Sequence, residues 1–392
     1  MPRYLLSDLE YGEDEERAVL EVLRSRWLSV GPRSEAFESE FAAFLGARHA
    51  VHVASCTAAL HLALLACDIG PGDEVLVPSY TFVASANPIL YVGATPVFVD
   101  IVGGGDLNMS PADAAAKITS RSKAMIVVHV AGFPADMQSL LTIAERHGLA
   151  VIEDAAHALG AMYTARGVRY PVGRLGHAAC FSFFANKNLP TGEGGMLVTE
   201  DAAIATRVRQ ARSHGMTKTS WDKASGRATD YDVQRLGFNY RSTELAAALG
   251  RIQLRKLPAN NDRRRELAER YRRNLAGCDG IEPAFGDRFA DAAHHLFAVL
   301  LRDPTTRAGF RERLAAEGIQ TSIHYPPVHH FTQYRRPGRE HEPLPLTADA
   351  AEREVTLPLH PLLTLDDVDI ICSHVASVGG RRGRRAPPET AG

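Results

Sequence analysis

The sequence has 392 residues, of which 45% are hydrophobic and 23% are charged, and its formal net charge is −2. This composition is typical of a globular protein and argues against binding to nucleic acid or to an anionic membrane through overall charge. The length predicts two domains. The five cysteines are scattered, and the first residues lack an apolar signal core, so we expect reduced thiols and a cytoplasmic protein without a membrane span.

Short apolar runs alternate with helical patterns over the first half of the chain. In chain order, the runs expected to form strands are 49–55, 73–79, 95–101, 123–132, 149–154, 178–185 and 195–200. The patterns expected to form helices are 57–67, 82–93, 136–148 and 202–215. The strands are rich in Val and Ile without clear polar alternation, so the sequence predicts an α/β fold with a mostly parallel sheet flanked by helices.

The pattern changes beyond these elements. A polar stretch is followed by two long helical patterns, 242–257 and 261–275, and then by shorter strands and helices. We therefore predict two domains and a tail, namely a large domain with an N-terminal arm over 1–255, a smaller C-terminal domain over 256–378, and a disordered basic tail over 379–392.

Two acids, Glu153 and Asp154, end the strand 149–154. Successive side chains of a strand point to opposite faces, so only one of these acids can face a ligand held over the sheet. Ligands bind beyond the carboxyl ends of such strands. A carboxylate there can hold a protonated heterocyclic nitrogen, whereas the alternative is that Asp154 caps a following helix.

A helix is expected to begin at Ser55, Cys56 and Thr57, directly after a strand. The exposed amides and the dipole of a helix N-terminus bind phosphate. The alternative is ordinary capping by Ser55 or Thr57.

Lys187 lies between an apolar strand and a glycine-rich loop, 191–195. A lysine amine condenses with an aldehyde when burial or neighbouring groups lower its pKa, although a solvated surface lysine is the alternative. Ser182, earlier on the same strand, can donate its hydroxyl to a phosphate. A helix N-terminus that can bind phosphate, an acid at a strand end and a lysine together match the chemistry of pyridoxal 5'-phosphate (PLP).

Six motifs resemble those of the DegT/DnrJ/StrS family of sugar aminotransferases. The resemblance runs from about Trp27 to Pro361 and rests on FESEFAAFLGARHAVHVASCTAALHLAL, VPSYTFVASANPILYVGATPVFVD, VIEDAAHALGA, FSFFANKNLPTGEGGML, LGFNYRSTELAAALGRIQL and GIQTSIHYPPVH. It implies the type I fold of PLP-dependent transferases, with a large PLP-binding domain and a smaller C-terminal α+β domain.

The resemblance also assigns roles in the cofactor site. Lys187 would form the Schiff base and act in catalysis with Asp154 and His157. The remaining assignments concern cofactor binding: Asp154 pairs with the pyridine nitrogen, His157 lies beside the cofactor, Phe82 stacks on its ring, Ser182 and the amides of Cys56 and Thr57 hold its phosphate, and Asn239 reaches the phosphate of the neighbouring subunit. Such a site requires a homodimer. Cys56 stands where many members have glycine, which makes this turn stiffer.

The substrate candidates lie in three other stretches. Trp27 and Ser29 belong to a segment that borders the sugar pocket in relatives, although Trp27 can equally anchor the N-terminal arm. Lys218 is a candidate for binding the diphosphate of a nucleotide sugar. The family places the stretch with His324 and Tyr325 near the substrate.

The resemblance implies a PLP-dependent aminotransferase that converts a nucleoside-diphosphate keto-sugar to an amino sugar with glutamate as donor. His157, where other members have Gln, resembles members that act at carbon 4 of a 4-keto-6-deoxy sugar. Amination at carbon 3 or of a cyclitol ketone, and a non-catalytic PLP-binding regulator, are the alternatives. We expect no metal, because no carboxylates accompany the histidines at ligand spacing; His294 and His295 are expected to be loop and core residues.

Overall fold

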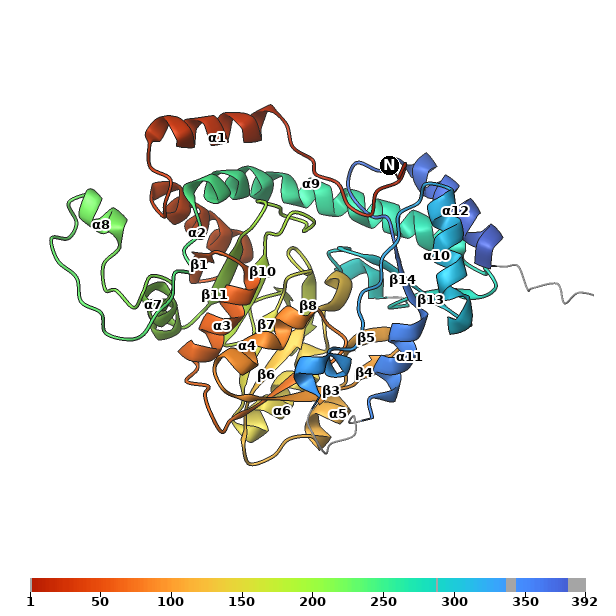
Figure 1. Cartoon of the computed structure of the whole chain (residues 1–392), viewed down its shortest axis with the longest axis horizontal. Coiled ribbons are helices and arrows are strands. Elements are labelled where there is room, and N and C mark those ends of the chain that lie inside the picture. Colours follow the sequence, from red (N-terminus) through yellow and green to blue (C-terminus); the bar gives the residue numbers. More distant parts are fainter. Residues whose placement is uncertain (1, 287, 336–342, 380–392) are drawn as a thin grey trace, which may run out of the picture.

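The computed structural model describes residues 2–286, 288–335 and 343–379. Figure 1 shows a central sheet among helices, a long helix that leads away from it, and a second group of elements near the C-terminal end of the described chain. The predicted tail lies outside the described residues except for Gly379, which ends the last helix. Among the described residues, the helices lack the combination of length and hydropathy that a membrane span requires.

In the described part of the chain, seven strands form the central sheet, in the spatial order β1-β11-β10-β7-β6-β2-β3. Their bounds are β1 (His49–Val53), β2 (Glu74–Pro78), β3 (Thr95–Val99), β6 (Ser122–Val128), β7 (Ala150–Asp154), β10 (Ala178–Ser182) and β11 (Gly195–Thr199). The neighbouring pairs are parallel except those of β11, which is antiparallel to β1 and β10. The expected α/β fold with a mostly parallel sheet is therefore confirmed.

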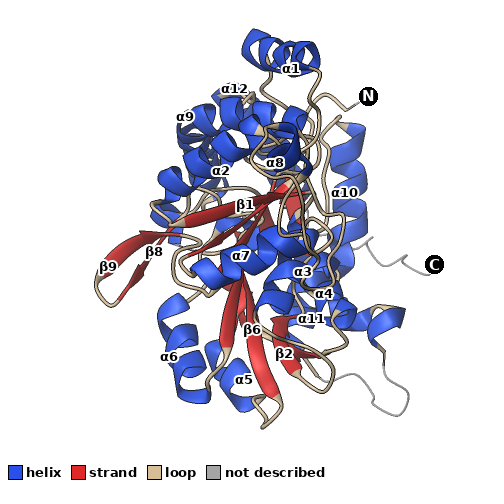
Figure 2. Cartoon of the chain, turned by 90° about the vertical axis from the view of Figure 1, so that its left-hand side faces the viewer, coloured by secondary structure: helices blue, strands red, loops and turns tan. Residues whose placement is uncertain are grey.

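Helices cover both faces of this sheet. One apolar core joins it to α2 (Pro32–Leu45), α6 (Met137–His147) and the start of α9 (Glu244–Leu275). The other joins it to α3 (Cys56–Ala66), α4 (Asn87–Tyr91) and α7 (Ala202–Ala211). Figure 2 shows strands between α5 (Pro111–Ala116) and α6 on one side and α3 and α4 on the other. Apolar side chains on both faces explain why the strands lack polar alternation.

Most of the remaining elements form a second group around α9, and two β-hairpins lie apart from the main sheet. The group contains β12 (Ile281–Pro283), β13 (Phe297–Leu301), β14 (Glu354–Leu357), α10 (Arg307–Ala316), α11 (Pro345–Arg353) and α12 (Leu365–Gly379). The hairpins pair β4 (Ile101–Gly103) with β5 (Asp106–Met109) and β8 (Met162–Ala165) with β9 (Val168–Pro171). Outside both lie α1 (Glu13–Ser25) and α8 (Ser220–Ala224).

The two helical patterns expected at 242–257 and 261–275 form one helix, since α9 continues through Pro258. A proline inside a helix removes one hydrogen bond and crowds the preceding turn. Buried side chains on both sides of it, Leu257 and Leu267 among them, pack into different cores and hold the helix across that position. The predicted domain boundary at 255/256 falls inside α9 and stays a prediction.

The prediction of a single helix over 82–93 is wrong. The structure divides it into a 3-10 turn, Val83–Ser85, and the short helix α4. Pro88 lies in the first turn of α4, where its missing N–H costs nothing, so it starts a helix instead of continuing one. This break places Ser85 at the edge of the sheet, next to the end of β7.

Candidate active site

A cavity of about 400 Å³ lies where β7 and β10 end and α3 begins. Its volume is within the range of small-molecule sites, roughly 300–1,000 Å³. Its lining includes most of the predicted cofactor residues and both residues of the predicted His-Tyr stretch: Cys56, Thr57, Phe82, Asp154, His157, Ser182, Lys187, His324 and Tyr325. Segments more than 250 residues apart in the sequence thus meet at the edge of the sheet predicted to bind a ligand.

The two acids at the end of β7 have opposite environments, as strand alternation predicted. Asp154 faces the cavity, is 5% exposed, and accepts hydrogen bonds from the Ser85 hydroxyl at 2.7 Å and the Ala156 amide at 3.1 Å. Burial raises the pKa of Asp154, while these two bonds and the charge of Lys187 act in the opposite direction. The result is a basic carboxylate at the cavity wall, suited to accept a hydrogen bond from a protonated ring nitrogen.

Glu153 is completely buried on the other face and is fully occupied by protein groups. It accepts a hydrogen bond from His129 Nε2 at 3.1 Å and others from the amides of Gly173 and Gly176. His129 Nδ1 itself accepts the Ala135 amide, so Nε2 carries the hydrogen. Although burial alone would raise the pKa of Glu153, these bonds lower it, which keeps the carboxylate charged in a structural role.

Lys187 extends into the cavity from the segment after β10 and is partly buried. Burial lowers the pKa of its amine to about 8, against the influence of Asp154 and Cys56, which raise it. An amine with this pKa is substantially neutral slightly above neutral pH, which is the form that attacks an aldehyde. The Nζ atom lies 3.4 Å from Nε2 of His295.

The N-terminus of α3 forms the opposite wall. Ser55 caps this helix by accepting the Ala58 amide, so its hydroxyl is engaged, while Cys56 and Thr57 supply the first helical amides. A Cβ on Gly195 would lie 2.5 Å from the carbonyl carbon of Ser55, so glycine allows β11 to pack against this turn. Gly195 at the start of β11 therefore leaves room for the turn that begins α3. Cys56 is accommodated with its Sγ 3.9 Å from Asp154 Oδ1.

Three aromatic residues line the open side of the cavity. His157 Nδ1 accepts the Ala131 amide at 3.3 Å, so Nε2 carries the hydrogen and donates to the Tyr325 hydroxyl at 3.1 Å. Burial first, and then the charge of Lys187, lowers the pKa of His157 well below its ordinary value, which keeps the ring neutral. Phe82 is 57% exposed beside Tyr325, with ring centroids 6.0 Å apart, and so presents a free aromatic face.

His324 is oriented by the buried carboxyl group of Glu354. Its amide donates to Glu354, and Thr356 lies between the two side chains, donating its hydroxyl to Glu354 Oε1 and accepting from His324 Nδ1 at 2.8 Å. Burial raises the pKa of Glu354 to about 8. Since Nδ1 of His324 is engaged by Thr356 and no described residue is hydrogen-bonded to Nε2, the second ring nitrogen is available to a ligand.

The structure does not bring four other predicted residues into this cavity. Trp27, Ser29, Lys218 and Asn239 are absent from its lining, and the last three are exposed. Trp27 packs on Trp221 with ring centroids 5.1 Å apart. Lys218 and Asn239 belong to the segment 213–241, which projects from the body and carries α8 (Figure 1). Trp27 contacts this segment through Trp221, whereas Ser29 pairs with Thr243 just beyond it.

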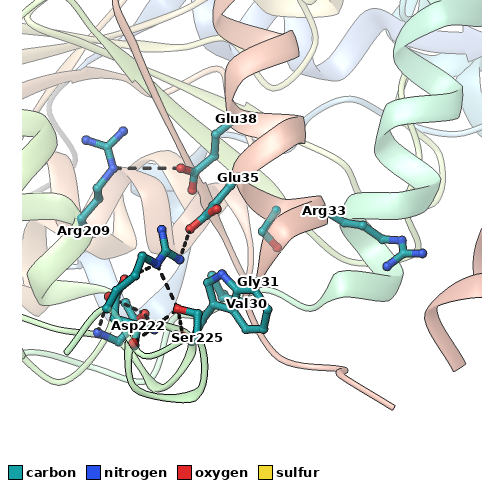
Figure 3. A network of polar contacts seen from close by, with 12 residues as sticks. Val30, Gly31, Arg33, Glu35, Glu38, Arg209, Asp222 and Ser225 are labelled. Atoms are coloured by element: carbon teal, nitrogen blue, oxygen red, sulfur yellow. Dashed lines mark hydrogen bonds and ion pairs between the residues drawn. The ribbon is translucent and has the colours of Figure 1, made fainter. Parts of the chain in front are cut away.

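Segment 213–241 is attached to α2 by charged contacts. Figure 3 shows Asp222 and Ser225 on this segment close to Glu35 of α2. Arg227 joins them, with 2.8 Å to Glu35, 3.4 Å to Asp222 and 3.0 Å to the Ser225 hydroxyl. The side chains of Arg227 and Glu35 are about half exposed, so water screens this attachment.

Two residues that contact the acid and the lysine of the site, Ser85 beside Asp154 and His295 beside Lys187, were not identified from the sequence. Ser85 lies inside one of the recognised motifs, but a serine in an expected helix gave no sign that it reaches Asp154. His295 was interpreted as a loop or core residue, and its contact with Lys187 spans 108 residues of sequence. A signal for both exists only in the tertiary structure.

Fold and site together define a PLP-dependent aminotransferase, and comparison with known proteins gives the family. The model of the DegT/DnrJ/EryC1/StrS aminotransferase family matches residues 10–376, and the chain belongs to this family. The chain is 41% identical over 373 residues to the spore coat polysaccharide biosynthesis protein SpsC of Bacillus subtilis (strain 168), covering 94% of this chain and 95% of SpsC.

Solved structures agree with this assignment. PseC of Helicobacter pylori, an aminotransferase involved in the biosynthesis of pseudoaminic acid, is similar with a TM-score of 0.88 and 31% identity, covering 96% of this chain and 99% of PseC. The PLP form of the putative sugar aminotransferase Spr1654 from Streptococcus pneumoniae has a TM-score of 0.88 and 29% identity, covering 96% and 98%. The chain is accordingly a sugar aminotransferase with PLP as cofactor.

Proposed function

We propose that this enzyme transfers an amino group from glutamate to carbon 4 of a 4-keto-6-deoxy sugar carried by a nucleoside diphosphate, with dTDP-4-keto-6-deoxyhexose as the first candidate. One observation carries the proposal: Lys187, Asp154 and the N-terminus of α3 open into a single cavity. The name of SpsC supports a product used in polysaccharide biosynthesis, and a natural product such as an antibiotic is the alternative destination.

The cofactor fits the chemistry of the cavity. The first amides of α3 and the Ser182 hydroxyl would bind its phosphate, and Asp154 would hold the proton on its ring nitrogen. Phe82 would cover one face of the ring. When bound, PLP supplies an aldehyde that carries the amino group and a conjugated ring that draws electrons from the carbon being deprotonated.

Lys187 would then act as the base and acid of both half-reactions. Its Nζ would take a proton from the carbon that bears the amino group to be transferred and would deliver a proton to the former aldehyde carbon of the cofactor; in the second half-reaction this transfer would run in reverse. A pKa near 8 suits this exchange, since the amine can both accept and release a proton at physiological pH. His157 would hold Tyr325 in place through its Nε2–H, so that the Tyr325 hydroxyl keeps its own hydrogen for a ligand oxygen.

The substrate side would be completed by a second copy of the chain. Asn239 is exposed, and three neighbours on the same segment expose apolar surface, with Leu236 at 93%, Val233 at 52% and Tyr231 at 50%. Such exposure of large apolar side chains marks a contact surface. In a homodimer with shared sites, Asn239 would reach the partner's phosphate, and Trp27, Ser29 and Lys218 would border the sugar or its diphosphate alongside His324.

We also propose a cytoplasmic location. Nucleotide sugars and PLP chemistry suit that compartment, and the five cysteines are free in the structure, which is typical of proteins kept under reducing conditions.

The test is amino transfer by the purified, PLP-loaded enzyme with glutamate and a panel of keto nucleotide sugars and cyclitol ketones. We expect 2-oxoglutarate to form with a 4-keto sugar and the product to carry nitrogen at carbon 4 by mass spectrometry and NMR, with Lys187→Ala as the inactive control. Turnover only with 3-keto sugars or cyclitols would move the reaction to those substrates. Tight PLP binding without transfer from any donor would favour the regulator.

A further inference from the structure

His295 lies beside Lys187 although it comes from the segment before β13. Its Nε2 atom is 3.4 Å from Nζ of Lys187, and its ring packs on that of His157 with centroids 4.4 Å apart. The side chain is only 4% exposed. His295 is not itself part of the cavity lining, but its Nε2 contacts the amine of Lys187 from behind that lining.

The tautomer of His295 follows from its neighbours. Asn188 donates its Nδ2 hydrogens to Asn261 Oδ1 at 2.9 Å and to the Ala293 carbonyl at 2.8 Å. Asn261 is fixed in turn, because its own Nδ2 donates to the Leu159 carbonyl. Asn188 Oδ1 consequently faces His295 Nδ1 at 3.0 Å as an acceptor, so Nδ1 carries the hydrogen and Nε2 presents a lone pair to Lys187.

Burial keeps this imidazole neutral. The pKa of His295 lies well below its ordinary value, first because of burial and then because of the charge of Lys187. The direction of the contact is thus fixed: Lys187 donates and His295 accepts. The titratable groups coupled to the lysine come from several elements around it, namely Asp154, Cys56, His157, His295 and His324.

We propose that His295 is a positioning residue for Lys187. Its Nε2 accepts a hydrogen from the free amine and holds the remaining lone pair of that amine toward the cavity during proton transfer. The proposal rests on the proposed role of Lys187 as the cofactor lysine. Holding a base in one orientation removes rotational freedom that would otherwise slow the transfer.

Three variants separate positioning from simple filling of the core. His295→Asn keeps a donor toward Asn188 and removes the nitrogen that faces Lys187. His295→Gln places an amide oxygen near the position that Nε2 occupies in the wild type, and so restores an acceptor for Lys187. His294→Asn is the matched control, because His294 is an equally buried neighbour whose Nε2 contacts the Phe289 carbonyl, and its φ of 47° is one that asparagine tolerates.

The measurement is the pKa of Lys187 in cofactor-free protein, obtained from the pH dependence of its acetylation by a limiting reagent and quantified on the Lys187 peptide by mass spectrometry. Removing an acceptor destabilises the ammonium form, so His295→Asn should lower the pKa by roughly 0.5–1 unit. His295→Gln and His294→Asn should stay near the wild-type value. In the loaded enzyme, His295→Asn should lower kcat about tenfold with little change in KM.

An unchanged pKa of Lys187 in folded His295→Asn, or an equal shift in His294→Asn, would overturn the proposal. If His295→Asn does not fold, ¹⁵N NMR of histidine-labelled wild-type protein decides, because the proposal requires hydrogen on Nδ1 of His295 and is wrong if Nε2 carries it. Trapping PLP on Lys187 with borohydride is independent of both results. Trapping on another lysine would remove the proposed function itself, whereas trapping on Lys187 with an unchanged pKa would remove only the role of His295.

Discussion

The cofactor cavity and the segment 213–241 are built in opposite ways. In the cavity, Asp154 is 5% exposed with both carboxylate oxygens bonded, and Lys187 has its amine placed between protein groups. In the segment, Lys218 and Asn239 are exposed, and the attachment to α2 depends on the half-exposed Arg227. One chain therefore places the side chains of Asp154 and Lys187 through its own contacts, whereas the exposed side chains of Lys218 and Asn239 are accessible to a ligand or to a second chain.

The largest effect should come from Lys187→Ala. We expect turnover to fall at least about 10⁴-fold, because no other lysine lines the cavity in the described part of the chain. PLP should still bind noncovalently through the start of α3. Steady-state kinetics and the absorbance of the bound cofactor test this together. Near-normal transamination would show that Lys187 in the cavity is not required for the reaction.

Asp154→Asn should come next, with a loss of about 10²-fold in kcat, since a neutral amide cannot hold a proton on the ring nitrogen. Glu153→Gln is the matched control on the opposite face of β7. It should cost stability, about 2–3 kcal/mol by urea unfolding, because it weakens the bond to the buried His129 and leaves an amide among backbone donors, yet spare most of the activity. The reverse pattern would mean that Glu153 serves the cofactor.

The low pKa of Lys187 predicts a pH dependence of stability. Between pH 8 and 10.5 the unfolded chain binds more protons at this lysine than the folded chain, so stability should rise with pH across this window. Relative to Lys187→Met, cofactor-free wild-type protein should gain up to about 3 kcal/mol between these limits in urea unfolding. A constant difference between the two proteins would show that the folded-state pKa is not lowered.

Mixing Lys187→Ala with Asn239→Asp tests whether the segment completes a partner's site. A hybrid dimer collects both lesions in one site and leaves the other intact, so random subunit exchange should restore about a quarter of wild-type activity. Exchange is verified with differently tagged chains. Absence of recovery despite exchange, or a fully active monomer, would contradict a shared site.

The smallest effect should come from Lys218→Ala. An exposed lysine that meets a diphosphate only in the bound state should raise KM for the nucleotide sugar by roughly 3- to 10-fold and leave kcat unchanged. Lys223→Ala is the control, since Lys223 lies on the same segment with its Nζ over the Tyr231 ring at 3.7 Å. Equal effects of both variants would indicate a general loss of positive charge instead of a specific contact.

The sequence predicted the parts of this molecule that depend on local pattern. Apolar runs located the strands, and strand alternation separated Glu153 from Asp154, because both features repeat over neighbouring residues. The continuity of α9 through Pro258 and the break of the expected helix before α4 depended on packing that no local window contains. Ser85 and His295 were missed for the same reason, since each contacts the site across many residues of sequence.

Lys187 is expected to be the residue that carries the cofactor. The most direct test is borohydride reduction of the PLP-loaded wild-type enzyme, followed by proteolysis and mass spectrometry of every lysine-containing peptide. We expect one phosphopyridoxyl group per chain, on the peptide that contains Lys187, and none in the Lys187→Ala variant. A modification on any other lysine, or an equal yield in that variant, would contradict it.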